Sequence, residues 1–129
     1  MAKVTIRGKE FPLCLTVTAL DKINEKCGGL SELTAFLNGP GDLSKAFHNT
    51  AWLLALLIEE GEKNRIVCAR FDGTQVENAD LPDYDTLCSL VTIRTMMRYR
   101  GTVMDAIGES MKQEIKAAPP KNVENAEQK

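Results

Sequence analysis

Apolar residues recur at helical spacing from Asp42 to Gly61, which is the longest apolar element of the chain. The spacing of three and four residues joins Leu43, Ala46, Phe47, Ala51, Leu54, Leu57 and Ile58. Asp42 can accept a hydrogen bond from a free N–H of the first turn, and Gly61 can end the helix in the left-handed conformation. Residues 51–58 are apolar on every side. The pattern therefore predicts a central helix that neighbouring elements cover from several directions.

Residues 3–17 alternate between apolar and polar side chains, which predicts a β-hairpin. A turn centred on Gly8-Lys9 pairs the apolar residues of the two strands on one face, Ile6 with Phe11 and Val4 with Leu13. Pro12 then lies opposite Thr5. Because proline has no N–H to donate to the ladder, we expect a four-residue loop over residues 7–10 or a place for Pro12 on an outer edge.

Two shorter helices are expected between the hairpin and the central helix. The first runs from Thr18 to Cys27, with Thr18 and Asp21 at the spacing of a capping box, and Gly28-Gly29 ends it. The second runs from Ser31 to Leu37. The residues expected to face inward are Leu20, Ile23 and Cys27 in the first helix and Leu33, Phe36 and Leu37 in the second.

The stretch from Glu62 to Leu81 leaves two alternatives open, a short second hairpin or an irregular loop. Residues 66–71 are apolar enough for a strand, and Asp72-Gly73 is a common hairpin turn pair. In the hairpin alternative, Val76 returns beside Ala69.

Two helices are expected at the C-terminal end, from Asp83 to about Leu90 and from Thr92 to about Lys116. Pro82 suits the first position of the shorter helix, and Thr92 can cap the longer one. Gly101 and Gly108 weaken the long helix by about 1 kcal/mol each relative to alanine, and they let another backbone approach closely. The residues expected to face inward are Ile93, Met96, Met97, Met104, Ile107, Met111 and Ile115.

These elements predict an α+β fold that is mainly α, with an N-terminal β-hairpin packed on a bundle of about four to five helices. One domain is expected over residues 1–116. The composition changes at Ala117, and the remaining residues to 129 are mostly polar and include two prolines. This composition predicts a disordered C-terminal tail over residues 117–129.

Net charge, cysteine and histidine spacing, and the length of the apolar runs exclude several classes of protein. The net charge of -2 argues against a generally basic nucleic-acid coat. The four cysteines and the single histidine lack the paired spacing of a zinc site, so we interpret the cysteines as reduced core thiols. Residues 1–10 contain no signal-peptide pattern, and the apolar run 51–58 is far shorter than the roughly 20 residues that span a bilayer. We therefore expect a cytoplasmic protein.

No reactive constellation points to an enzyme. His48 lies one turn before Trp52 and is interpreted as a surface or boundary histidine. The serines and cysteines fall in no nucleophile motif, and the glycine pairs are not followed by the G-K-[ST] of a phosphate loop. The aspartates at 80, 83 and 85 lack the calcium-loop pattern and suit a helix N-terminus. We expect no catalytic residue, no cofactor and no metal.

Two features of the last helix are candidates for binding. The methionines at 96, 97, 104 and 111 form either ordinary core or an adaptable protein-binding surface, because methionine is flexible and polarizable. Arg94, Arg98 and Arg100 surround Tyr99, and they suit phosphates and a stacked base, a solvated face, or an acidic protein partner. The candidate protein-binding residues are therefore Met96, Met97, Tyr99, Met104, Met111, Arg94 and Arg98.

Three short segments carry a family resemblance: G-K-E-F-P-L-C-L-T at residues 8–16, C-G-G-L-S-E-L at 27–33 and E-E-G-E-K at 59–63. With them, residues 4–65 resemble the small tail assembly chaperones of long-tailed bacteriophages and prophages, which are encoded between the tail tube and tape-measure genes. The segments are fold-forming and not catalytic. The C-terminal half is similar only in outline, as a late helical pair.

The resemblance implies a non-enzymatic assembly factor in the cytoplasm of the bacterial host, absent from the mature virion. Its expected partners are the tape-measure protein and the tail tube protein, with self-association as a further property. A long helical tape-measure protein would offer apolar stripes to a methionine-lined groove. The alternative is a small DNA-binding or regulatory helical protein that uses Arg94, Arg98 and Arg100, although nucleic acid is not the expected partner.

Overall fold

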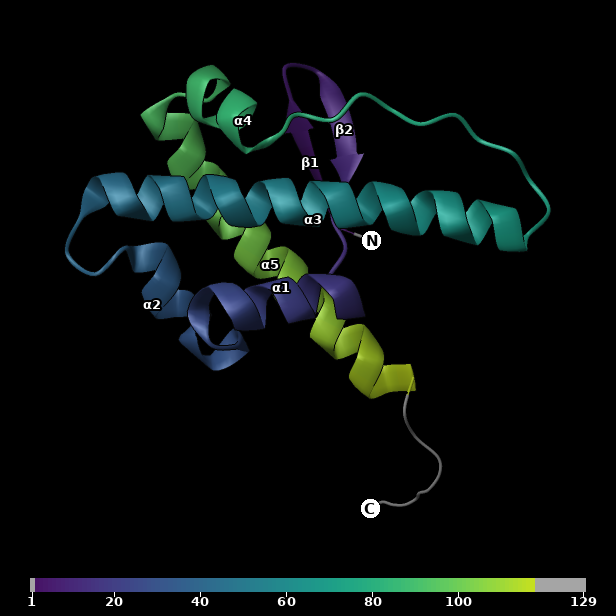
Figure 1. Ribbon diagram of the computed structural model, residues 1–129, viewed down its shortest axis with the longest axis horizontal. Helices are drawn as coiled ribbons and strands as arrows, with labels where there is room; N and C mark the ends of the chain where they lie inside the picture. Colours follow the sequence, from purple (N-terminus) through teal and green to yellow (C-terminus); the bar gives the residue numbers. More distant parts are fainter. Residues whose placement is uncertain (1, 118–129) are drawn as a thin grey trace, which may run out of the picture.

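Helix α3 (Leu43–Phe71) is the element around which the chain is arranged (Figure 1). The structure is a computed structural model that describes residues 2–117, and the side chains of residues 2–111. Along the chain the other elements are β1 (Lys3–Ile6), β2 (Lys9–Pro12), α1 (Val17–Cys27), a 3₁₀ helix (Leu30–Glu32), α2 (Leu33–Asn38), α4 (Tyr84–Leu90) and α5 (Ile93–Ala117). The expected fold class, mainly helical with an N-terminal hairpin, is confirmed. Except for Ala117, the predicted tail lies outside the described residues.

The elements surround α3 from three directions. In Figure 1 the hairpin and α4 lie above α3, α1 and α2 lie below it, and α5 crosses behind it. Each side of the middle of α3 meets a different neighbouring element, which explains why residues 51–58 are apolar all round. Fully buried side chains from these elements form one core, including Ile23, Leu37, Leu54, Leu57, Leu87 and Val103.

The hairpin pairs in a different register from the expected one. Val4 lies opposite Phe11 and Lys3 opposite Pro12, which is a shift of two residues, so the same side chains still face the core. The predicted four-residue loop is wrong, because Arg7 and Gly8 both adopt positive φ, at 50° and 83°, and form a two-residue turn. In this register Pro12 falls at a non-hydrogen-bonded position, so its missing N–H removes no bond from the ladder.

Helix α3 begins where expected and ends ten residues later than predicted. The Asp42 carboxylate accepts a hydrogen bond from the Lys45 N–H at 3.2 Å and caps the helix. Gly61 does not end it. Gly61 is buried in the middle of α3, where a Cβ would overlap the main-chain carbonyl of Pro12. The helix ends at Phe71 instead, and Gly73, two residues later, adopts the left-handed conformation with φ 80°.

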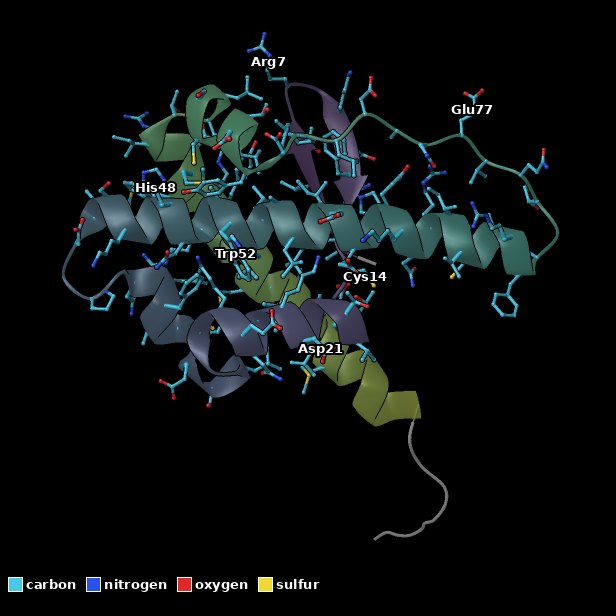
Figure 2. The ribbon with its side chains drawn as sticks, viewed as in Figure 1. Arg7, Cys14, Asp21, His48, Trp52 and Glu77 are labelled. Carbon is cyan, nitrogen blue, oxygen red and sulfur yellow. The ribbon has the colours of Figure 1, made fainter. Side chains whose placement is uncertain are left out.

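The apolar stretch at residues 66–71 is helical, so the hairpin alternative for residues 62–81 is wrong. Residues 74–83 form an irregular return segment along the distal part of α3 (Figure 1). Glu62 fastens this segment, because its carboxylate accepts hydrogen bonds from the Ala79 N–H at 2.7 Å and from the Arg65 guanidinium at 2.7 and 2.9 Å. Arg65 also donates to the carbonyl of Glu77, which lies above α3 in Figure 2.

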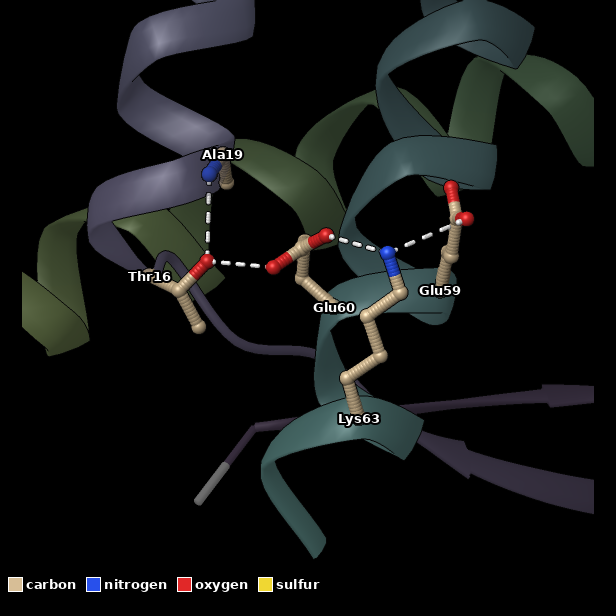
Figure 3. Close-up of polar contacts among 5 residues, drawn as sticks. All are labelled: Thr16, Ala19, Glu59, Glu60 and Lys63. Atoms are coloured by element: carbon tan, nitrogen blue, oxygen red, sulfur yellow. Dashed lines mark hydrogen bonds and ion pairs between the residues drawn. The ribbon is translucent and has the colours of Figure 1, made fainter. Parts of the chain in front are cut away.

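Thr16, not the predicted Thr18, caps α1. Its hydroxyl accepts a hydrogen bond from the Ala19 N–H at 3.1 Å and donates one to Glu60 Oε1 at 2.6 Å (Figure 3). Lys63 Nζ lies 3.5 Å from Glu60 Oε2 and also contacts Glu59. Both oxygens of the buried Glu60 carboxylate are thus paired, and the start of α1 is tied to the middle of α3.

The last two helices begin close to the expected positions. Asp83 caps α4 by accepting a hydrogen bond from the Thr86 N–H at 2.8 Å, so Pro82 precedes the cap and is not the first helical residue. This bond lowers the pKa of Asp83 below its ordinary value. Thr92 lies before α5 and accepts from the Thr95 N–H at 3.4 Å, as predicted.

Candidate protein-binding surface

A groove of about 380 Å³ opens between the start of α3, the end of α4 and the start of α5. Its apolar lining consists of Leu43, Phe47, Val91, Ile93 and Met96. Ser44, His48 and Cys88 complete the lining, and none of the lining residues is an acid, a lysine or an arginine. The groove is therefore an apolar surface with a few neutral polar groups along it.

The ends of three helices build this groove. Leu43 is the first residue of α3 and Ile93 is the first of α5, and they are 65% and 64% exposed. Val91 ends α4 in an extended conformation, with its N–H bonded to the Leu87 carbonyl at 3.0 Å. Met96 forms the buried floor, at 4% exposure. Two large apolar side chains thus stand in solvent above an apolar floor.

His48 gives one edge of the groove its hydrogen-bonding group. Its Nδ1 lies 2.8 Å from the Tyr84 hydroxyl and 3.5 Å from Cys88 Sγ. Burial and the neighbouring Cys88 raise the pKa of Tyr84 above its ordinary value, so the phenol keeps its proton at neutral pH. The predicted surface position of His48 is confirmed, because the side chain is exposed.

Trp52 follows His48 by one turn of α3 and lines a different pocket from the groove. Its ring meets Phe36 edge-on, with 5.8 Å between ring centroids, and Lys26 Nζ lies 5.5 Å from it (Figure 2). These contacts join α3 to α1 and α2, on the opposite side from α4 in Figure 1. Trp52 also lines a second pocket with Leu81, Pro82 and Tyr84, so Tyr84 stands between this pocket and the groove that His48 lines.

The candidate residues of α5 divide between core and surface. Met96 and Tyr99 are buried, whereas Met97 and Met111 are 61% and 40% exposed, and Met104 is half-buried. The prediction that Ile93, Met97 and Met111 face inward is wrong. The side chain of Ile115 is outside the described part of the chain. The core-facing residues are Met96, Tyr99, Val103, Ala106 and Ile107, which recur at helical spacing on a neighbouring face.

Tyr99 links α5 to the hairpin. Its hydroxyl donates a hydrogen bond to the carbonyl of Thr5 at 2.8 Å, and the side chain is 8% exposed. Thr5 stands at a non-hydrogen-bonded position of the hairpin, so its carbonyl is free to accept from α5. A ring held in this way cannot stack on a base, which removes one part of the nucleic-acid alternative.

The three arginines do not form one patch. Arg94 and Arg98 are exposed, whereas the Arg100 guanidinium is hydrogen-bonded to the side chain of Asn38 at the end of α2. Only two of the three guanidinium groups are therefore free of α2, and no observation here favours a nucleic-acid surface.

The groove itself was not predicted from the sequence, although Met96 was among the candidates. Leu43, Phe47 and Ile93 were expected to face the core, because an apolar residue in the first turn of a helix has the same pattern whether a neighbour covers it or not. Among the described residues, Met96 is the single methionine that lines this groove, and the expected methionine-lined binding surface stays a prediction.

Within the described residues, no three His, Cys, Asp or Glu side chains gather as metal ligands, and no helix is both long enough and apolar enough to cross a bilayer. All four cysteines are free thiols; three are half-buried, but Cys68 is exposed, so its interpretation as a core residue is wrong. Comparison with protein-family models, curated proteins and solved structures finds no match to this chain.

Proposed function

We propose that this chain is a tail assembly chaperone of a long-tailed bacteriophage or prophage. In this role it binds the tape-measure protein, tail tube subunits or both in the cytoplasm of the bacterial host, without turning over a substrate. Two things support the proposal: the resemblance of residues 4–65 to that family, and the uncharged groove whose rim leaves Leu43 and Ile93 in solvent. The groove is the observation that carries it.

The shape and chemistry of the groove suit the apolar stripe of a helical partner. An amphipathic helix binds in such a groove through apolar residues one turn apart, while its polar face stays in water. Leu43 and Ile93 supply exposed apolar contacts on both walls, and His48 supplies one hydrogen-bonding group at the edge. A long tape-measure protein would offer many such stripes, so several weak contacts along one partner give avidity without a tight single site.

The test is co-purification of the tagged chain with tail tube and tape-measure proteins from cells that produce the phage. The binding variant carries Leu43→Asp and Ile93→Asp, which place two charges on the rim of the groove. The matched control carries Val17→Asp, because Val17 is also a large exposed apolar residue, at 78%, and lies away from the groove at the start of α1.

We expect the wild type and the control to recover tail proteins, and the groove variant to recover at least tenfold less of them with an unchanged circular dichroism spectrum. Recovery of tail proteins at the wild-type level by the groove variant would contradict the groove as the binding site. Recovery of nucleic acid or host regulators by the wild type, without tail proteins, would contradict the proposed function as a whole.

A further inference from the structure

One face of α5 carries alternating methionine and glycine residues that stand largely in solvent. Met97, Gly101, Met104, Gly108 and Met111 follow one another at intervals of four, three, four and three residues. Met97 and Met111 are 61% and 40% exposed, both glycines are exposed and Met104 is half-buried. This interval pattern is that of a seam between two paired helices.

Nothing in the described part of the chain packs against the two glycines of α5. Glycine weakens a helix relative to alanine, yet a Cβ at Gly101 or Gly108 would meet no atom within 4 Å. Gly61 is the contrasting case, because a Cβ there would overlap the carbonyl of Pro12. The positions on α5 thus leave room for a helix from outside the chain to approach closely.

The charges beside this seam change sign along the helix. Arg98 and Asp105 each follow a seam methionine by one position and therefore lie on the same flank, seven residues apart. Both side chains are exposed, and neither forms an ion pair with another residue in the part of the chain that the structure describes. If a second copy of α5 lies beside the first in the opposite direction, the positive residue of one flank meets the negative residue of the other.

We infer that α5 pairs with α5 of a second copy of the chain in antiparallel orientation. A two-fold axis between the helices then places Met97 opposite Gly108 of the partner subunit and Met104 opposite Gly101 of the partner subunit. Met97 and Met104 each fill the space that a glycine leaves. The same axis also brings Arg98 close to Asp105 of the partner subunit, and the symmetry generates this contact two times in the dimer. A parallel pair would set glycine against glycine and leave voids, so the pattern selects the antiparallel arrangement.

This pairing is independent of the proposed function, since it uses none of the groove residues. From residue 97 to residue 111 the seam is about 21 Å long. A single helix face of this length buries less surface than the roughly 1,200 Å² or more of stable complexes. We therefore expect association at micromolar concentrations. Exposed ion pairs add little affinity, so the fit of methionine to glycine supplies the attraction and the charges set the orientation.

Sedimentation velocity over a concentration series tests the pairing with two charge reversals. Arg98→Asp and Asp105→Arg each create two like-charge contacts in the antiparallel pair, so each variant alone should associate at least tenfold more weakly than the wild type. An equimolar mixture of the two variants restores both attractive contacts and should form the mixed dimer. A parallel pair, in which residue 98 does not meet residue 105, would show no such rescue.

Gly101→Leu separates association from folding. Leucine raises helix propensity at this open position, but its side chain occupies the space that Met104 of the partner subunit needs. We expect an unchanged or higher unfolding midpoint and association weakened at least tenfold. A wild type that stays monomeric at several hundred micromolar would overturn the inference. So would dimers that Arg98→Asp and Gly101→Leu leave intact, or a mixture of the two charge variants that does not recover.

Discussion

Gly61 lies directly against the main chain of Pro12, so that the middle of the longest helix touches the end of the hairpin without any intervening side chain. The next residues reinforce this contact, because the Cys14 N–H donates a hydrogen bond to the Leu57 carbonyl at 3.3 Å. Cys14, which is labelled in Figure 2, lies beside α3 at this junction. The position of β2 on α3 therefore depends on the missing side chain at residue 61.

Replacing Gly61 with alanine should destabilise the protein by roughly 3 kcal/mol or more, because the added methyl group overlaps main-chain atoms that cannot rotate away. Urea denaturation followed by circular dichroism measures the change. The matched control is Gly101→Ala, studied at a concentration too low for self-association. It should stabilise α5 by roughly 0.5–1 kcal/mol, since position 101 is open. Equal effects of the two substitutions would mean that Gly61 is not in close contact.

Tyr99→Phe should lower the free energy of unfolding by about 1–3 kcal/mol. The variant keeps the buried ring but leaves the Thr5 carbonyl without its donor from α5. Because the bond joins α5 to β1, amide exchange in the hairpin should also accelerate. Tyr84→Phe is a useful comparison, since its partner His48 is exposed and can bond to water instead. A larger loss of stability from Tyr84→Phe would contradict this assignment.

Thr16→Val should cost about 1–3 kcal/mol of stability. The substitution preserves the shape of the side chain, but it removes the cap of α1 and the donor to the buried Glu60 carboxylate (Figure 3). Thr16→Ser keeps the hydroxyl and should retain most of the stability, as measured by thermal and urea unfolding. If serine were destabilising and valine were not, the methyl group of Thr16 and not its hydroxyl would be the stabilising part.

Acid should weaken the attachment of the return segment to α3 through Glu62. Hydrogen bonds from Arg65, followed by the bond from the Ala79 N–H, lower the pKa of Glu62 from its ordinary value of 4.5, although burial opposes them. A carboxyl group with a lower pKa in the folded state stabilises the protein above its unfolded pKa. That contribution is lost as the pH falls through the folded pKa. The loss therefore occurs below about pH 4.5.

The measurement compares the wild type with Glu62→Gln by urea denaturation at pH 6 and again near pH 3. The variant should be less stable at pH 6, and the difference between the two proteins should shrink at the lower pH. The other carboxylates are common to both proteins and cancel in the comparison. A difference that stays constant between the two pH values would show that the charge of Glu62 does not matter.

Most of the fold could be predicted because its signals are local. The alternation of residues 3–17 identified both faces of the hairpin, and the register error of two residues left those faces unchanged. Asp42 and Thr92 cap their helices as predicted. The choice between Thr16 and Thr18 needed the position of Glu60, which lies 44 residues away from Thr16 in the sequence.

The end of α3 and the groove could not be predicted in the same way. A glycine after an apolar helix suits a helix end, yet at Gly61 it marks a close contact with a distant strand. Residues 66–71 contain too few positions to separate a strand from a helix by periodicity. Leu43 and Ile93 have the pattern of core residues, and only the packing of the other helices shows that they face solvent.

The return segment gives α3 two parts of unequal stability. None of the residues from Lys63 to Asp80, all within the described part of the chain, is buried, and Phe71 is 89% exposed. The proximal part, up to Glu62, carries the core of the protein. Hydrogen exchange should therefore be fast in the distal helix and slow in the proximal one, with the change near Gly61. We therefore expect one continuous helix in shape to behave as two cooperative units, the outer of which opens and closes while the core stays folded.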